Sequence, residues 1–516
     1  MKSLTLFFTI ALATFAAACN SGVGGPPPPR PTGAFSNVSL KGAYAFQMNG
    51  TDVNSHPISR IGVFTADGMG NITAGSEDVN DGGTINAGTG VPVLFNPAPQ
   101  STYTVQANGR GMLTLVDASG KLTFSITLSS SSAGLIVETD GNSTVSGSFR
   151  SQTVTTTFSP AYAFDFSGVD LANQVGLSLV GQFSTNTGTT INGGVFDIND
   201  GGTLSSQVSI PASTIVLDST TFGTTFGRGR AIIDGLTFVF YVVDGSNLAV
   251  LEEDSSGLTS GFATAQTAVP TVISGLAGSF VLDVGGAASS SGITGPLVRI
   301  GRFDASNGTV SNLFLDQNFS GSALTFGGSG SISNLTFTID PAGSGRGTLG
   351  FTDVTTGDLF SYVFYLTSAS GGFIQDISPS SGLIADGSLS LQSGTFTAAS
   401  LAGNYIANWT GFNLGNGFEE DFNAQFALTS AASSNVSGTV DYTELGNNQI
   451  VTGAGVGGTF TLTGNGTLGG TMANTLTLQA GGQSFKFNAY LISNNSMVLI
   501  GVDSAHVVVG TVIRQP

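Results

Sequence analysis

The chain has 516 residues, 14 of them Lys or Arg and 32 Asp or Glu, so its formal net charge is −18 and only 9% of its residues are charged. An average soluble domain is about 25% charged, and a nucleic-acid binder needs a basic surface, so the composition excludes nucleic acid as a partner. The single cysteine, Cys19, excludes an internal disulfide and a thiolate zinc site.

The N-terminus has the pattern of a secretory signal. Lys2 precedes an apolar run at 4–13, and the small residues 16–18 follow it. The run is too short for a membrane-spanning helix, which needs about 20 apolar residues. Residues 16–19 resemble the lipobox of bacterial lipoproteins, although Ala16 stands where that motif usually has Leu. The resemblance implies that Cys19 is lipidated and anchors the chain in the cell envelope, in the outer membrane. The alternative is an ordinary signal peptide with an incidental cysteine.

Residues 20–38 predict a tether between this anchor and a folded body. The segment contains Gly24-Gly25 and then the proline run 26–31, interrupted only by Arg30. Proline runs adopt polyproline II at roughly 3 Å per residue and act as semi-rigid spacers. Acyl chains on Cys19 would supply the membrane affinity.

The rest of the chain repeats one unit four times. An aromatic residue in a segment that begins with Gly or Pro recurs at steps of 118, 118 and 125 residues. Gly-Arg-Gly occurs in three copies, and the fourth copy has Gly464-Asn465-Gly466 in its place. A glutamine closes every copy. A period near 120 residues is that of a domain, so we expect units at 39–153, 158–268, 275–393 and 400–516. The landmark residues are Tyr44, Tyr162, Phe280 and Tyr405; Arg110, Arg228 and Arg346; and Gln152, Gln266, Gln392 and Gln515.

Each unit is predicted to be all-β. Apolar and polar residues alternate, as in 124–128, and turn residues interrupt the runs every 8–15 positions. Eight sequential antiparallel strands in about 110 residues favour an up-and-down β-barrel, because closure removes exposed strand edges; a β-sandwich is the alternative. The strands expected in the first unit are 42–48, 59–66, 71–79, 101–107, 111–116, 121–128, 134–140 and 145–152, with a longer loop at 86–100.

The opening of each unit resembles that of lipocalin- and avidin-like barrels. The segments 40–44 and 401–405 carry the Gly-x-aromatic pattern, and an arginine follows later in three of the four copies. The resemblance implies a barrel whose interior is filled by side chains or holds one small ligand. The whole chain is similar to the multi-copy, Gly/Ser/Thr-rich envelope lipoproteins of acidobacteria.

The sixth strands of units 2 and 3 are apolar on both faces. Val239, Tyr241, Val363 and Tyr365 lie on the face that would otherwise meet water. We therefore expect these strands to pack against a neighbouring unit or a partner.

Residues for catalysis are sparse. His56 and His506 stand at non-equivalent positions of different units, and a lone histidine makes no triad, so both are expected at the surface. The candidate carboxylates for a glycosidase are Glu252-Glu253, which point to opposite faces of a strand, and Glu419-Glu420-Asp421, which resemble a solvated loop. We expect no enzyme, with a carbohydrate-active enzyme as the remote alternative.

One motif suggests calcium. Asp78, Asn80 and Asp81 precede two glycines, and Asp197, Asn199 and Asp200 repeat the pattern. Oxygen ligands at alternate positions beside a glycine resemble the start of a calcium loop, but the distal bidentate Glu is missing. The same residues make a good hairpin turn, which is the favoured interpretation. No other cofactor is predicted.

The repeated arginines have two interpretations. A buried carboxylate of the same unit, such as Glu138 or Glu252, would satisfy the guanidinium as a barrel plug or turn; an anion site is the alternative. For the whole chain we expect a lipid-anchored, non-catalytic binding or interaction scaffold, with glycan, matrix or other envelope proteins as partners. A carrier of small apolar ligands inside the barrels is the alternative.

Overall fold

The computed structural model describes residues 35–186, 189–290, 293–328, 330–379, 382–430, 433–444, 446, 449–463 and 474–516. The expected signal sequence, Cys19 and nearly all of the expected tether lie outside the described residues. The fourth Gly-x-Gly landmark, at 464–466, lies outside them too.

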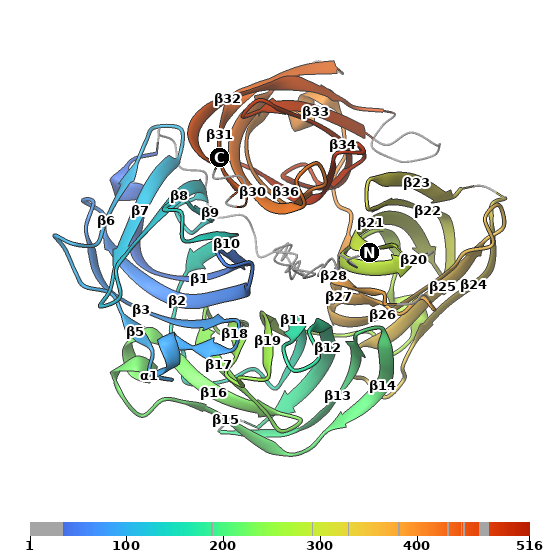
Figure 1. The fold of residues 1–516 in the computed structure, drawn as a ribbon. Helices are drawn as coiled ribbons and strands as arrows, with labels where there is room; N and C mark the ends of the chain where they lie inside the picture. The colour runs from blue at the N-terminus through green and yellow to red at the C-terminus, as the bar shows by residue number, and fades with distance from the viewer. Residues whose placement is uncertain are drawn as a thin grey trace, which may run out of the picture.

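The protein is all-β, with 67% of the chain in strands and 4% in helices. The strands form four separate antiparallel sheets, one for each repeat (Figure 1), which confirms the predicted class of four barrel units. Five short helices occur in the described part of the chain, where none was expected: η1 (Asn37–Ser39), η2 (Asn86–Gly88), α1 (Thr221–Phe226), η3 (Ile273–Gly275) and α2 (Ala398–Leu401). Local capping explains α1, because the Thr220 hydroxyl accepts from the Phe222 N–H and Gly227 ends the helix at φ 69°.

Unit 1 contains all eight expected strands in up-and-down order. The expected loop at 86–100 contributes Phe95 to the core. One very short strand, β4, precedes this loop, and another, β5, lies within it. A single bridge, from Asn71 just before β3 to Thr102 of β6, joins the two ends of the sheet. The strands are β1 (Lys41–Asp52), β2 (Pro57–Asp67), β3 (Ile72–Asp81), β4 (Thr84–Ile85), β5 (Val93–Leu94), β6 (Thr102–Val105), β7 (Arg110–Val116), β8 (Lys121–Ser130), β9 (Ala133–Glu138) and β10 (Ser143–Ser151).

Unit 2 closes into a barrel because β13 pairs with β12 on one side and with β14 and β15 on the other. Its strands are β11 (Ala161–Asp170), β12 (Val175–Thr185), β13 (Thr190–Asp200), β14 (Thr203–Ile210), β15 (Ser213–Leu217), β16 (Arg228–Ile233), β17 (Leu236–Val242), β18 (Asn247–Glu252) and β19 (Gly257–Ala265).

Unit 3 has the same order of strands but leaves its two outermost strands, β23 and β24, at the opposite ends of the sheet. Its strands are β20 (Gly278–Ser290), β21 (Ile293–Ser306), β22 (Thr309–Phe319), β23 (Ser322–Gly327), β24 (Ile332–Ile339), β25 (Arg346–Asp353), β26 (Leu359–Ser368), β27 (Gly371–Asp376) and β28 (Ile384–Leu391).

Unit 4 is a closed eight-stranded barrel, completed by the pairing of its first strand with its last. Its strands are β29 (Gly403–Asn413), β30 (Phe418–Leu428), β31 (Ser433–Glu444), β32 (Gln449–Thr461), β33 (Asn474–Ala480), β34 (Gln483–Ser493), β35 (Ser496–Gly501) and β36 (His506–Arg514).

Each barrel encloses its own hydrophobic core. Alternate side chains of every strand point inward, and four large clusters of buried aromatic and aliphatic residues fill the four units. The aromatic landmarks Tyr44, Tyr162, Phe280 and Tyr405 all belong to these clusters and are at most 1% exposed. The repeated aromatic is therefore a core residue, and its burial contributes roughly 2–3 kcal/mol per copy.

The four units form a closed ring, in which the fourth packs against both the third and the first (Figure 1). The sequence pattern predicts the four units but not the contact between the first and the last. We call the contacts joints 1–2, 2–3, 3–4 and 4–1, after the units that they connect.

Apolar clusters lie in the first three joints. Val239 and Tyr241 pack against Ile61 and Val63 in joint 1–2, and Val363 and Tyr365 pack against unit 2 in joint 2–3; a third cluster fills joint 3–4. The four sixth-strand residues are all 0% exposed, so the predicted packing against a neighbour is confirmed.

The ring has two distinct faces, because like ends of the barrels meet at every joint. On one face lie the two described ends of the chain: Phe35 and Gln515 both approach Gly109. We call this the terminal face. On the other, turns of adjacent units meet, as at Gly83 and Ser255.

Candidate functional site

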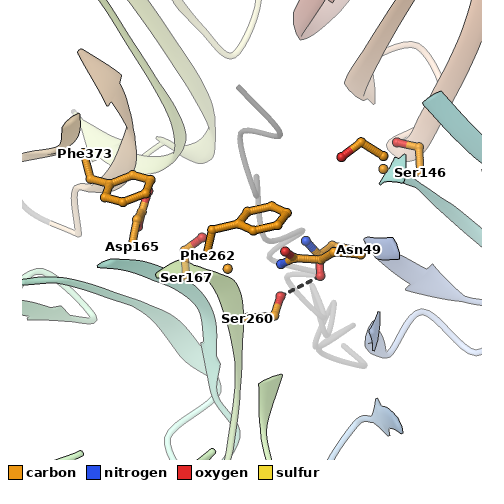
Figure 2. Close-up of a pocket in the computed structure, with 11 residues that line it drawn as sticks. Asn49, Ser146, Asp165, Ser167, Ser260, Phe262 and Phe373 are labelled. Atoms are coloured by element: carbon orange, nitrogen blue, oxygen red, sulfur yellow. Dashed lines mark hydrogen bonds between the residues drawn. The ribbon is translucent and has the colours of Figure 1, made fainter. Parts of the chain in front are cut away.

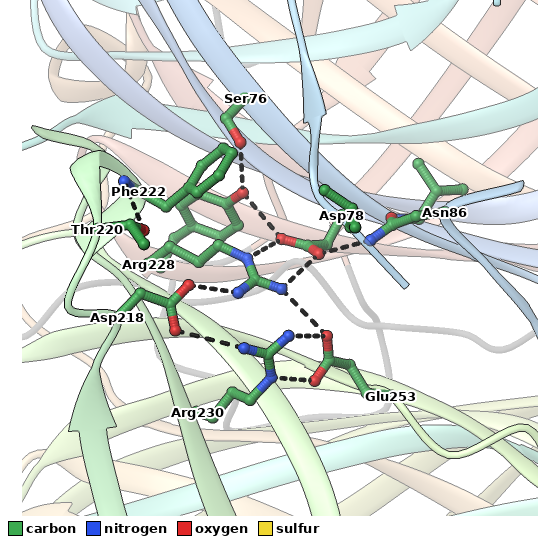
Figure 3. A network of polar contacts seen from close by, with 12 residues as sticks. Ser76, Asp78, Asn86, Asp218, Thr220, Phe222, Arg228, Arg230 and Glu253 are labelled. Atoms are coloured by element: carbon green, nitrogen blue, oxygen red, sulfur yellow. Dashed lines mark hydrogen bonds and ion pairs between the residues drawn. The ribbon is translucent and has the colours of Figure 1, made fainter. Parts of the chain in front are cut away.

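A cluster of Asp, Arg and Tyr holds joints 1–2 and 2–3, and part of it recurs in the other two joints. In joint 1–2, Arg228 of β16 donates from Nε and Nη2 to the two oxygens of Asp78 on β3, at 2.7 and 2.8 Å, and the Tyr241 hydroxyl donates to the same carboxylate at 2.9 Å (Figure 3). Arg228 is 0% exposed. Burial opposes its charge, but hydrogen bonding to Asp78 outweighs this and raises the Arg228 pKa. This bidentate pair is a strong, geometrically specific contact.

Joint 2–3 repeats the cluster. Arg346 donates to both oxygens of Asp197 at 2.8 Å, and the Tyr365 hydroxyl donates at 2.6 Å. In joint 3–4 the equivalent carboxylate, Asp316, accepts from Tyr490 at 2.6 Å and from Asn488 at 2.8 Å. A tyrosine and a carboxylate therefore recur in three consecutive joints.

Joint 4–1 closes the ring with an arginine–aspartate pair. Arg110 of the first unit donates to Asp441 of the last, at 2.6 Å to Oδ2, and Ser125 donates to the same oxygen. Ser146 donates to Asp421 at 2.9 Å in this joint. The contact is thus largely polar.

The closing glutamines form a second repeated contact on the terminal face. In three joints the amide of the glutamine donates to two backbone carbonyls of the next unit: Gln152 to Phe226 and Val242, Gln266 to Ser344 and Leu366, and Gln515 to Asn108 and Leu128. In the remaining joint, Gln392 donates to the Leu491 carbonyl. The glutamine landmark therefore connects each unit to the next around the ring.

The expected partners of the arginines are wrong. Glu138 lies in the lumen of barrel 1 beside Arg60, and Glu252 lies in the lumen of barrel 2, where it accepts from Thr259. The arginines instead cross to the carboxylate of a neighbouring unit, and they are neither barrel plugs nor free anion sites.

In each copy of the expected calcium motif, the first two residues lie in a joint and the third does not. Asp78 and Asp197 bind the joint arginines. Asn80 donates to two carbonyls of unit 2, and Asn199 donates to the Leu383 carbonyl of unit 3. Each asparagine also accepts from a glycine N–H three residues on, as the predicted hairpin turn requires.

Asp81 and Asp200 point away from the joints. One ligand atom each from Asp81, Asp52 and His56 lie within 4.8 Å of one another, and His56 is exposed, as expected. The structure thus separates Asp81 from the first two residues of its motif, and calcium at the expected sets stays a prediction.

The inner wall of the ring carries both polar side chains and the rings of Phe262 and Phe373. A small cavity of about 30 Å3 opens there between units 1 and 2, with Phe373 of unit 3 at its edge (Figure 2). Its polar lining includes Asn49, which accepts from Ser260 at 2.6 Å, and Asp165. This volume holds a few water molecules and is far below the roughly 300 Å3 of a pocket for a small-molecule ligand.

Buried charges occupy one end of several barrel lumens. In barrel 1 Arg60 contacts Glu77 and Glu138, and in barrel 3 the equivalent Arg299 contacts Asp376. Burial raises the pKa of Glu138 to about 8, against the opposing effect of Arg60. Barrel 2 has Leu179 where units 1 and 3 have arginine, and burial raises the pKa of its Glu252 to about 7.

Barrel 4 has a different buried pair, His506 and Glu420, although the sequence pattern predicted a surface histidine and a solvated loop. His506 Nδ1 lies 2.7 Å from Glu420 Oε1, and the two residues are 5% and 0% exposed. The expectation of a surface histidine is therefore wrong. Burial lowers the His506 pKa, but the hydrogen bond that protonated His506 donates to Glu420, together with the Glu420 charge, outweighs burial and raises the pKa above its usual value.

The segment 419–421 is a buried strand and not the expected solvated loop. Its side chains alternate, so Glu420 enters the lumen, while Glu419 contacts Thr51 and Asp421 contacts Ser146 across joint 4–1. Burial raises the Asp421 pKa to about 7. The prediction that Glu252 and Glu253 point to opposite faces is confirmed, because Glu253 binds Arg230 outside the lumen.

Charge is unevenly distributed between the two faces. The turns opposite the terminal face carry Lys121, Lys486 and His56 but many more half-buried or exposed carboxylates, so we call this the acidic face: Asp52, Asp81, Asp140, Asp170, Asp200, Asp234, Asp254, Asp358 and Asp503. The terminal face has fewer acids, together with Lys41 and Arg514: Asp67, Asp218, Asp244, Asp304 and Asp340.

No family model matches the chain, and no curated protein matches it. Among solved structures, a mutant of the vaccine antigen Transferrin Binding Protein B from Haemophilus parasuis is 10% identical, covering 75% of this chain and 84% of that one, with a TM-score of 0.16. The intact two-lobed Ap-TbpB is also 10% identical, over 74% and 84% of the chains, with a TM-score of 0.15. At these TM-scores the similarity supports no conclusion about function.

No helix in the described part of the chain is both long and apolar enough to cross a membrane.

Proposed function

We propose that this chain is a lipid-anchored cell-envelope protein that acts as a non-catalytic binding scaffold, with the acidic face of the ring as its docking surface. The observation that supports this is the two-faced ring. Phe35, which follows the tether, lies on the terminal face beside Gln515, so an anchor at Cys19 would leave the opposite face free. That face carries the excess of carboxylates and suits a cationic partner.

The barrels favour a scaffold over a carrier. A carrier of apolar ligands needs lumen space, but each lumen is packed with buried aromatic and aliphatic side chains and, at one end, with buried charges. Catalysis by a carboxylate pair is disfavoured as well, because Glu252 and Glu253 diverge, and so do Glu419 and Glu420. Glycan, matrix or envelope proteins remain the proposed classes of partner.

Binding of a lysine-rich peptide to the immobilised protein tests the docking surface. We expect the double variant Asp234→Asn/Asp358→Asn, on the acidic face, to weaken binding several-fold, and added salt to weaken it further. The matched control, Asp244→Asn/Asp340→Asn, removes the same charge from the terminal face. Equal loss in both variants would show that net charge alone is responsible and would contradict the proposal.

The anchor needs its own test. We expect labelled fatty acid to enter the full-length protein in cells and the Cys19→Ser variant to lose both the label and membrane association. Unlabelled parent protein would contradict lipidation without affecting the docking surface.

A further inference from the structure

Joint 4–1 has a threonine where the other three joints have an asparagine. Strand pairing fixes the position, because Thr443 of β31 lies opposite Asp421 of β30. In the first three units the residue opposite the asparagine is uncharged. The three pairs are Ser59 with Asn80, Ser178 with Asn199, and Val298 with Asn318.

The asparagines connect adjacent units through their amide nitrogens, which donate to backbone carbonyls of the next unit. In joint 1–2 the receiving carbonyls belong to Glu252 and Gly257, at 3.1 and 3.0 Å. The residues of unit 1 at the same positions of the repeat are Glu138 and Ser143. Thr443 has a hydroxyl in place of the amide, so it offers no N–H to these two carbonyls.

Asp421, opposite Thr443, is a carboxylate that the joint only partly satisfies. Its side chain is 0% exposed. Oδ1 accepts from Ser146 of unit 1 at 2.9 Å, and Thr410 also bonds the carboxylate, but Oδ2 is buried without a hydrogen-bond partner. A buried carboxylate oxygen without a donor or a cation is strongly unfavourable.

Two further buried oxygens on this face have no partner, namely Thr443 Oγ1 and Asn423 Oδ1. Asn423 follows Asp421 by two residues, so both side chains leave β30 on the same face, and its amide nitrogen is already used by the Ser125 carbonyl at 3.3 Å. Glu419, two residues before Asp421, adds a second buried carboxylate. Residues opposite each other in a strand pair have Cβ atoms about 5 Å apart, and residues two apart along a strand about 7 Å. One ion can therefore reach several of these oxygens.

The described cations around this joint already have partners. Arg110 binds Asp441, and Arg150 extends to joint 1–2, over an aromatic ring of unit 2. Arg60 and His506 pair with carboxylates in the lumens of barrels 1 and 4. The free groups are thus oxygen acceptors only, two of them carboxylates. Such a set selects a hard cation, and calcium above all, because calcium takes several oxygen ligands in flexible geometry.

We propose that joint 4–1 contains a calcium site, in which Asp421, Asn423 and Thr443 bind the ion through their side-chain oxygens and Glu419 supplies the second carboxylate. The ion takes the place of the asparagine amide of the other joints, beside the carbonyls of unit 1. Because the two units form the site together, calcium stabilises the closed ring. The site is separate from the expected motifs at 78–81 and 197–200, and it does not depend on the proposed docking surface.

Terbium, which replaces calcium at oxygen sites, tests the proposal in the whole protein. The only tryptophan of the chain, Trp409, stacks on Phe422 with ring centroids 4.9 Å apart, and Phe422 follows Asp421 in β30. Terbium at the site is therefore close enough to be excited through Trp409. We expect saturable terbium luminescence that calcium displaces, together with heat of calcium binding in calorimetry.

Two variants restore residues found at the same positions of other units, so both are expected to fold. Thr443→Asn supplies the amide of the other three joints, and Asp421→Ser supplies the serine of units 1 and 2. Each should weaken calcium binding at least about tenfold, because affinity depends on the charge and number of the ligands. The matched control, Asp52→Asn/Asp81→Asn, removes the oxygen cluster of the acidic face and should leave the terbium luminescence unchanged.

Two results would overturn the proposal. One is a parent protein that gives neither heat with calcium nor terbium luminescence that calcium displaces. The other is a calcium affinity that is the same in Thr443→Asn, in Asp421→Ser and in the parent. Neither result bears on the docking surface of the acidic face, which the lysine-rich peptide tests.

Discussion

Arg110 and Asp441 lie 331 residues apart in the sequence, yet the Arg110 guanidinium is 2.6 Å from Asp441 Oδ2. Together with Gln515, which donates to Asn108 and Leu128, this pair connects the last unit to the first. Every other joint links units that follow each other in the chain, so joint 4–1 decides whether the protein is a ring or an open row.

Replacing Arg110 by Gln tests this. The change leaves Asp441, which is 1% exposed, without its cation, so we expect unfolding of the joint to become easier by about 3 kcal/mol. Small-angle scattering should show a larger, more open particle. Arg230→Gln, at a partly exposed arginine, is the control and should leave the radius of gyration unchanged; an unchanged radius in Arg110→Gln would mean that the pair is dispensable.

The closing glutamine makes a separate contribution. Gln515→Ala removes a donor to two buried carbonyls, which we expect to cost about 1–3 kcal/mol. Hydrogen exchange should show faster opening of β7 and β8 next to joint 4–1. Gln479→Ala, which removes an exposed amide of unit 4, is the matched control.

Stability should fall with rising pH because of Glu252. Its pKa is about 7 in the folded protein and 4.5 when exposed, so the folded state binds the proton more tightly. The stabilisation is complete below about 4.5 and is lost as the pH rises to about 7. Glu252→Gln should remove roughly 3 kcal/mol of this dependence, measured by denaturation at several pH values; an unchanged slope would place the dependence elsewhere.

The pair in barrel 4 gives a further prediction. Glu420→Gln removes the acceptor that favours protonated His506, so we expect the His506 pKa, followed by NMR, to fall. The raised pKa of His506 stabilises the folded protein fully below about pH 6.5, and this stabilisation is lost as the pH rises through the folded-state pKa. The variant should therefore lose stability mainly at acidic pH. His56, exposed and in another unit, is the internal control.

The double variant Glu420→Leu/His506→Leu tests the role of the pair. Units 1, 2 and 3 have Ile58, Leu177 and Leu297 at the position of Glu420, and all are buried. Replacing both polar partners by leucine is therefore expected to cost little, since buried ion pairs often contribute less than apolar packing. A loss above about 3 kcal/mol would show that the pair does more than fill the lumen.

The sequence predicted the four units, the strands and the buried sixth strands, because each depends on period-two alternation and on landmarks that recur along one chain. It did not predict the ring, since the partner of each landmark lies in another unit. Asp78, Asp197, Asp316 and Asp441 recur in step with the arginines, which is a signal for a charge pair. Choosing between a carboxylate of the same unit and one of the next requires the three-dimensional arrangement.

The lumen charges were missed for a similar reason. The charged neighbours of Glu420 in the chain suggest a solvated loop, whereas Ile58, Leu177 and Leu297 at the same position of the repeat predict an inward side chain. His506 corresponds to Ser143, Gly257 and Leu383, which suggest no common role, so its pairing with Glu420 could not be read from the repeat.

Joint 4–1 also differs from the others in its chemistry, and this bears on how the ring folds. Apolar clusters fill the first three joints, whereas the contact between units 4 and 1 is made by Arg110, Asp441, Ser146 and Gln515. In a chain that folds from its N-terminus, the first unit stays folded without a partner on that side until the last unit has folded. The polar surface of unit 1 at joint 4–1 stays soluble during this time and does not bind other chains. The ring is therefore closed at the contact where the unfinished protein is least prone to aggregate.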